Sequence, residues 1–186
     1  MDRAWAAEKT REVIHLEVGQ PDFDTPAHIV EATCRFASAG HTKYVPNAGV
    51  DPLREAAARY FARTTGVATG PEHILVTPGA VMSVASSFLA LLEPGDEVLL
   101  PDPGWPNYHM AVSIVHGQPI FYNLRAENRF LPDLGEIENL VTDRTKLMLL
   151  CTPSNPTGQI YDETLMRDLI RLAQRHDLWV LSDEIY

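Results

Sequence analysis

The stretch that decides the fold covers residues 146–186 and reads KLMLLCTPSNPTGQIYDETLMRDLIRLAQRHDLWVLSDEIY. It contains two short apolar runs, residues 146–151 and 178–182, and each predicts a buried strand. Residues 162–176 between them predict a helix. A strand, a helix and a second strand in this order indicate two parallel strands joined by a helix that covers the sheet.

The same alternation of strands and helices extends upstream to residue 73. We predict strands over residues 73–77, 97–100 and 118–122, and helices over 79–92, 107–115 and 134–141. Before them we predict an extended arm (1–25) with a short strand over 13–18, a helix that Thr25 caps and that runs from Pro26 to Gly40, and a helix from Asp51 to near Gly66. The fold class is therefore α/β, with a mostly parallel sheet that has helices on both faces.

The composition argues against several classes of function. The 186 residues carry a formal net charge of −10, so no basic surface for nucleic acid is expected. Cys34 and Cys151 form no CxxC pair and the seven histidines show no HxxxH or HExxH spacing, so neither a disulfide framework nor a metal site is expected. The first residues lack the apolar stretch of a secretory signal, and no segment has the length to span a bilayer. We therefore expect a cytoplasmic protein without membrane contact.

Four unusual segments follow predicted strands, at the edge of the sheet where α/β proteins bind ligands. Thr77-Pro78-Gly79 opens a helix and leaves backbone N–H groups free at its positive end, which suits a phosphate. By itself this segment is more typical of ordinary helix capping, and it has neither a Walker A lysine nor a GxGxxG pattern. Trp105 lies in a Pro/Gly-rich turn and either offers a flat face to an aromatic ligand or seals the edge of the sheet.

The other two segments place polar side chains after the last two strands. Asn155 lies between Pro153 and Pro156, so the turn displays its amide rigidly and is compatible with a cis Asn155–Pro156 bond. Asp183 needs a cationic or hydrogen-bonding partner if it is buried, and a protonated heteroaromatic nitrogen satisfies that need. Tyr186 is placed to donate to an adjacent phenolate oxygen. A phosphate, a flat ring, a protonated ring nitrogen and an exocyclic oxygen together describe pyridoxal 5′-phosphate (PLP).

With these motifs the sequence resembles the class I/II aminotransferases of the fold-type I PLP-dependent enzymes. The resemblance extends from Gly19-Gln20-Pro21-Asp22-Phe23 through Asn155-Pro156-Thr157-Gly158 to Asp183-Glu184-Ile185-Tyr186. It implies that residues 1–45 form an N-terminal arm with a segment of the small domain. It also implies that residues 46–186 form the N-terminal part of the large PLP-binding domain, which ends before the catalytic lysine.

The resemblance implies a role for each candidate residue. Those that would bind the cofactor are Gly79, Ala80 and Val81 at the phosphate, Trp105 on the ring face, Asn155 and Tyr186 at the ring oxygen, Asp183 at the ring nitrogen, and Tyr44 at the phosphate of the neighbouring subunit in a homodimer. Gly19 would approach the α-carboxylate of the substrate through its backbone.

The activity implied is the transfer of an amino group between an amino acid and a 2-oxo acid. The Schiff-base lysine of the family lies downstream of the Asp-x-x-Tyr motif, whereas the lysines here are Lys9, Lys43 and Lys146. No catalytic residue is therefore assigned, and the chain alone is expected to be inactive. Val81 stands where some relatives that select acidic substrates carry a lysine, which lowers the expectation of aspartate as the substrate.

Two alternatives stay open. One is another fold-type I PLP enzyme, such as a C–S lyase or a decarboxylase, because the residues that hold the ring do not select the bond that breaks. The other is a short non-catalytic protein that binds PLP or dimerises. An aminotransferase-like transcription regulator is disfavoured, since no basic helix-turn-helix segment precedes the PLP motifs.

Overall fold

The structure of the chain is a computed structural model that describes residues 2–15, 19 and 21–186. It consists of two compact units, residues 1–46 and 47–186. The assignment of these parts to an arm with a small-domain segment and to a cofactor-binding domain stays a prediction. Among the described residues, no helix combines the length and the apolar character that crossing a bilayer requires.

The first unit contains the helices α1 (Asp2–Glu8) and α2 (Ala27–Ser38). The predicted helix over 26–40 is confirmed, but Thr25 does not cap it, because Pro26 occupies the N-cap position and no side chain caps the helix. Residues 13–15 form no strand, and residues 16–18 of the strand predicted there lie outside the described part of the chain. No residue of α2 is buried.

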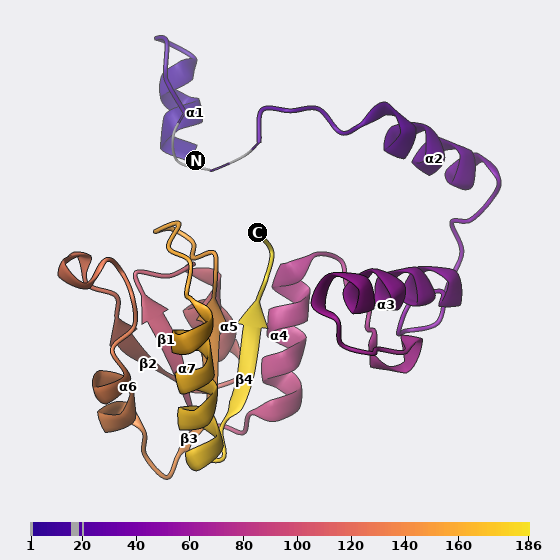
Figure 1. Cartoon of the computed structure of the whole chain (residues 1–186). Coiled ribbons are helices and arrows are strands. Elements are labelled where there is room, and N and C mark those ends of the chain that lie inside the picture. Colours follow the sequence, from indigo (N-terminus) through magenta and orange to yellow (C-terminus); the bar gives the residue numbers. More distant parts are fainter. Residues whose placement is uncertain (1, 16–18, 20) are drawn as a thin grey trace. The chain divides into compact units, whose positions relative to one another are not determined.

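The second unit is built on a sheet of four strands. They are β1 (Glu97–Asp102), β2 (Gln118–Asn123), β3 (Thr145–Cys151) and β4 (Trp179–Asp183), in the order β2-β1-β3-β4. All three neighbouring pairs are parallel, so the carboxyl ends of the strands meet at one edge, toward which the arrows point in Figure 1. This arrangement confirms the predicted α/β fold with a parallel sheet.

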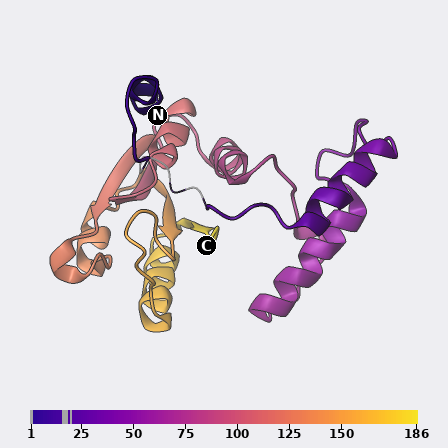
Figure 2. The ribbon, with the colours of Figure 1, turned by 90° about the horizontal axis from the view of Figure 1, so that it is seen from above.

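Alternation along β1 and β3 directs side chains into a core on each face of the sheet. One core contains Val98 and Leu100 under α4 (Ala80–Leu91) and α5 (Asn107–Ile114). The other contains Leu99 under α6 (Leu134–Leu140) and α7 (Glu163–Arg175). Figure 2 views this layered arrangement from the side of the carboxyl edge. Burial on both faces explains why these strands are continuous apolar runs rather than alternating ones.

Capping residues explain where several helices begin and end. The carboxylate of Asp162 accepts a hydrogen bond of 2.8 Å from the N–H of Leu165 at the start of α7, and Asp133 caps α6 in the same way. The helix α3 (Asp51–Thr65) ends at Gly66, which adopts a φ of 74° and donates its N–H to the carbonyl of Ala62. The predicted end of α3 near Gly66 is therefore confirmed.

The strand predicted over 73–77 is wrong. A short 3₁₀ helix (η1, Pro71–His73) begins there, and Ile74 beyond it is extended but unpaired with any strand of residues 47–186. The backbone groups of residues 74–76 form hydrogen bonds outside the sheet. The carbonyl of Ile74 accepts from the side chain of Arg54 in α3, and the N–H of Val76 donates to the carbonyl of Ala48 at 3.0 Å. Gly49 allows this close approach, since it has a φ of +102° and a Cβ there would lie 2.6 Å from Cγ2 of Val76.

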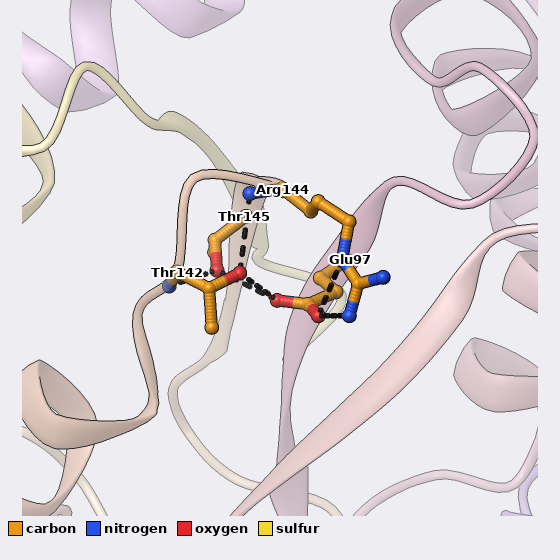
Figure 3. A network of polar contacts seen from close by, with 4 residues as sticks. All are labelled: Glu97, Thr142, Arg144 and Thr145. Atoms are coloured by element: carbon orange, nitrogen blue, oxygen red, sulfur yellow. Dashed lines mark hydrogen bonds and ion pairs between the residues drawn. The ribbon is translucent and has the colours of Figure 1, made fainter.

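A polar network joins the amino ends of β1 and β3 (Figure 3). Glu97 is buried, and its carboxylate accepts hydrogen bonds from the side chains of Thr142, Arg144 and Thr145 at distances between 2.6 and 3.2 Å. Burial alone raises the pKa of Glu97, but the hydrogen bonds and the charge of Arg144 outweigh it and hold the pKa below its ordinary value. The network fixes the turn before β3 at the edge of the sheet opposite to the candidate site.

Candidate functional site

Three depressions lie along the carboxyl edge of the sheet. One of about 340 Å³ is lined by Ala80 and Ser83 of α4 together with Asp183 and the residues on either side of it. A second of about 290 Å³ is lined by the turn 153–158 and by Tyr186. A third of about 260 Å³ is lined by Trp105 and neighbouring residues of β1, α5 and β2. The candidate residues of the second unit are thus divided among three neighbouring parts of one edge.

The amino end of α4 leaves backbone donors free beside Asp183. Gly79 occupies the N-cap position with a φ of 86° and no side-chain cap, a backbone conformation that favours glycine. Within residues 47–186, no hydrogen-bond acceptor is present for the N–H groups of Ala80 and Val81. The hydroxyls of Thr77 and Ser83 lie 2.6 Å apart and tie the preceding turn to the helix. The first turn of α4 therefore offers unsatisfied donors at the positive end of the helix dipole.

Asp183 ends β4, pairs in register with Cys151 of β3, and is half-buried. Its Oδ2 accepts a hydrogen bond of 2.6 Å from the phenol of Tyr108, and its Oδ1 accepts one of 3.2 Å from the N–H of Ile185. No cationic side chain of residues 47–186 forms an ion pair with it. The carboxylate is therefore held in place and still has lone pairs for a cation.

Sequence reasoning missed Tyr108 as part of this site. Tyr108 lies on α5 and is 2% exposed, and its ring meets the indole of Trp105 edge-on with the ring centroids 5.3 Å apart. Burial raises the pKa of Tyr108, and the hydrogen bond to Asp183 raises it further, so the phenol stays a donor at neutral pH. The signal in the sequence was weak, since it consisted only of a tyrosine three residues after Trp105 at the start of a predicted helix.

Trp105 is partly buried against the core formed by β1, β3, α4 and α5. It lines a depression shared with Asp102, His109 and Phe121 and not the one that contains Asp183. Its contact with the site runs through Tyr108, which touches both residues. The structure thus connects the indole with Asp183 without placing the two in the same depression.

Asn155 and Tyr186 line the same depression, and their shared contact with a ring oxygen stays a prediction. The Asn155–Pro156 bond is cis, and the turn is closed by a hydrogen bond of 2.7 Å from the N–H of Gly158 to the carbonyl of Ser154. Neither the amide of Asn155 nor the phenol of Tyr186 makes a hydrogen bond to any residue that the structure describes. Both polar groups are therefore available to a ligand.

The chain matches the family model of aminotransferase class I and II over residues 11–186. It belongs to this family. Family members depend on PLP, so the predicted cofactor class and the resemblance to fold-type I enzymes are confirmed.

Individual members of the aminotransferase family align along almost the whole chain. The probable aspartate/prephenate aminotransferase of Thermus aquaticus is 41% identical over 175 residues, which are 94% of this chain and 46% of that protein. The structure of the aspartate aminotransferase of Thermus thermophilus with maleate superposes with a TM-score of 0.96 at 38% identity. The match covers all of this chain and 49% of that protein's chain. The alanine aminotransferase of Pyrococcus furiosus superposes with a TM-score of 0.93 at 36% identity over 98% of this chain and 47% of its own. The chain therefore spans about half the length of these relatives.

The remaining candidates of the aminotransferase site lie in the first unit. Gly19 and Tyr44 are both exposed within residues 1–46, and their predicted contacts with substrate and with a neighbouring phosphate stay predictions. Lys146 is the one lysine of residues 47–186, and it lies exposed near the amino end of β3, at the edge opposite to Asp183. No group of His, Cys, Asp or Glu side chains in the described part of the chain is placed to hold a metal ion.

Proposed function

We propose that these residues form the ring-holding part of a PLP-dependent aminotransferase, which transfers an amino group between an amino acid and a 2-oxo acid. The observation that carries the proposal is Asp183, a carboxylate at the carboxyl end of a parallel strand that protein donors hold and that has no cationic partner within residues 47–186. A carboxylate in this state suits the protonated ring nitrogen of PLP.

The other groups at this edge fit the rest of the cofactor. The free N–H groups of Ala80 and Val81 suit the phosphate, because an anion at the amino end of a helix meets both donors and a favourable dipole. The amide of Asn155 and the phenol of Tyr186 suit the ring oxygen, since both line one depression. The stacking role of Trp105 rests on the family resemblance, because the indole lines a different depression.

PLP, when bound, supplies an electron sink for negative charge at the Cα of the substrate. Asp183 would hold the proton at the ring nitrogen that this chemistry requires, and Tyr108 holds Asp183. Asn155 and Tyr186, which line one depression, would orient the ring by binding its oxygen. Lys146, the one lysine of residues 47–186, lies at the opposite edge and is not placed to exchange protons with a substrate bound here.

We also propose that the protein acts as a cytoplasmic homodimer in which Tyr44 reaches the phosphate of the neighbouring subunit. Support comes from the first unit, where Tyr44 is fully exposed and the apolar Ile29, Val30 and Phe36 of α2 are about half-exposed. A helix with apolar side chains and no buried residue calls for a covering surface. Sedimentation of the intact protein tests this, and a single species with the mass of one chain would contradict it.

The cofactor part of the proposal is tested by titrating the purified chain with pyridoxamine 5′-phosphate in a calorimeter. Asp183→Asn removes the negative charge at the ring nitrogen and is expected to weaken binding about ten-fold or more, the worth of a hydrogen bond to a charged group. Asp143→Asn is the matched control, because it makes the same chemical change at an exposed carboxylate in the turn before β3, at the edge of the sheet opposite to Asp183, and it should leave affinity unchanged. Equal affinities of all three proteins would refute the assigned role of Asp183.

The reaction class is tested on the intact native protein with an amino acid labelled with ¹⁵N and an unlabelled 2-oxo acid. Amino transfer predicts that the label appears in the amino acid formed from the 2-oxo acid. Release of the label as ammonia together with pyruvate would instead assign a lyase, and loss of carbon dioxide would assign a decarboxylase.

A further inference from the structure

The contact between Tyr108 and Asp183 joins two elements that are far apart in the sequence. The phenol of Tyr108 on α5 donates to Oδ2 of Asp183 at the end of β4, at a distance of 2.6 Å. Asp183 has a second fixed donor, the N–H of Ile185, on its other oxygen. Two donors on opposite oxygens define the plane of the carboxylate, so the remaining lone pairs have a set direction.

Tyr108 is itself immobilised by its surroundings. Tyr108 is 2% exposed, and its ring packs in the core with Cys151 and makes an edge-to-face contact with the Trp105 indole. A buried aromatic ring with neighbours on several sides has one accessible rotamer, and its hydroxyl is therefore a fixed point. The bond thus transfers the rigidity of α5 and its core to a half-exposed carboxylate at the ligand-binding edge.

We propose that Tyr108 is the positioning residue for Asp183, and that it aims a free lone pair of that carboxylate at the ring nitrogen of PLP. This inference rests on the proposed cofactor site. Tyr108 touches no cofactor atom in this scheme and acts through Asp183 alone. Loss of its hydroxyl therefore affects recognition of the ring nitrogen and leaves the phosphate, the ring oxygen and the ring face unaffected.

The test is a thermodynamic cycle between the protein and the ligand. The chain and its Tyr108→Phe variant are each titrated with pyridoxamine 5′-phosphate and with the 1-deaza analogue, in which carbon replaces the ring nitrogen. The unsubstituted chain should bind the nitrogen-containing ligand more tightly than the analogue. Tyr108→Phe should lose about ten-fold of affinity for pyridoxamine 5′-phosphate and almost none for the analogue.

Tyr122→Phe is the matched control. Tyr122 is also a buried tyrosine whose phenol donates to an acceptor of the core, the carbonyl of Leu149 at 2.9 Å, but it lies in the core on the other face of the sheet. Its substitution removes a buried hydroxyl without touching Asp183 and should change the affinity for neither ligand. A loss that Tyr122→Phe reproduces would show a general structural effect and would overturn the inference.

The remaining outcomes separate the inference from the proposed function. Equal losses for both ligands in Tyr108→Phe, or no loss for either, would overturn the role of Tyr108 while Asp183 and the cofactor site stand. Failure of the unsubstituted chain to prefer the nitrogen-containing ligand would overturn the proposed cofactor site and the inference with it.

If Tyr108→Phe fails to fold, a measurement on the unsubstituted chain tests the inference instead. The hydroxyl proton of Tyr108, assigned in the NMR spectrum through the ring protons of the same residue, should change its chemical shift when pyridoxamine 5′-phosphate binds. The shift should stay unchanged with the 1-deaza analogue, and equal changes with both ligands would overturn the inference.

Discussion

Replacing Glu97 by glutamine tests how much the polar network at the amino edge of the sheet contributes to stability. The Glu97 side chain is 4% exposed, and its carboxylate accepts two bonds from Arg144, at 2.8 and 3.2 Å, and one each from Thr142 and Thr145, at 2.6 and 3.2 Å. Glutamine has the same shape, so it keeps the packing and changes only the charge and one acceptor. Its amide oxygen faces Arg144, and its NH₂ group faces hydroxyls that must rotate to accept.

The expected cost follows from this exchange. Charge-assisted bonds contribute about 1.5–3 kcal/mol each and neutral ones about 0.5–1.5 kcal/mol. The loss of stability is smaller than the full difference between charged and neutral hydrogen bonds, because Arg144 is mostly exposed and water solvates its charge in the variant. We expect Glu97→Gln to lower the free energy of unfolding by about 2 kcal/mol. The control is Glu163→Gln, which removes an exposed ion pair with Arg167 one helical turn away and should cost about 0.5 kcal/mol or less.

The sign of the pH dependence follows from the lowered pKa of Glu97. A carboxyl whose pKa is lower in the folded state stabilises the fold above its ordinary pKa of 4.5, and the contribution disappears as the pH falls through the folded pKa. The difference between the chain and Glu97→Gln should therefore be constant at neutral pH and shrink below about pH 4.5. Urea unfolding at a series of pH values measures it. A Glu97→Gln cost that equals that of Glu163→Gln, or one that does not depend on pH, would refute the reasoning.

Three further substitutions test other parts of the second unit. Gly49→Ala should cost about 2 kcal/mol or more in urea unfolding, because a Cβ there lies 2.6 Å from Val76 at a φ of +102°; a cost below that of Gly135→Ala would contradict this. Asp162→Ala should cost about 1 kcal/mol through the lost cap of α7, and Asp162→Asn should recover most of it; equal stability of both variants would argue against a cap. Asn155→Ala should weaken binding of pyridoxamine 5′-phosphate about five-fold but leave that of its 3-deoxy analogue unchanged; equal losses would remove Asn155 from the ring oxygen.

The sheet was predictable because its strands are buried on both faces. Val98, Leu99 and Leu100 point alternately into the two cores, so every position of this run is apolar. A strand with one exposed face would alternate apolar and polar residues instead. Residues 73–77 show a similar run and yet form no strand. A segment becomes a strand only when a neighbouring strand pairs with its backbone N–H and C=O groups. Here the N–H of Val76 donates to Ala48 and the carbonyl of Ile74 accepts from Arg54 instead. The apolar pattern of residues 73–77 therefore specifies neither a hydrogen-bond partner nor burial, since Leu75 is 60% exposed.

The sequence predicts a candidate site residue where its position directly after a strand suffices to identify it. It does not predict one whose role depends on a hydrogen bond to a residue far away in the sequence. Asp183 and Asn155 follow strands directly, so the rule that ligands bind at carboxyl ends identifies them from local sequence. Tyr108 precedes Asp183 by 75 positions, and its importance lies only in the bond between them. No local pattern distinguishes it from Tyr122, which is buried to the same degree and bonds a backbone carbonyl.

The two buried or half-buried carboxylates of the sheet show why one edge is structural and the other suits a ligand. Glu97 at the amino edge accepts four hydrogen bonds from three side chains, one of them a guanidinium, which satisfies its acceptor capacity and its charge within the protein. Asp183 at the carboxyl edge accepts one bond from a neutral phenol and one from a backbone N–H. Its negative charge has no cationic partner within residues 47–186, although two donors orient it. A carboxylate that the protein orients without neutralising is stabilised by a cationic ligand, and this difference in pairing favours the carboxyl edge as the cofactor site.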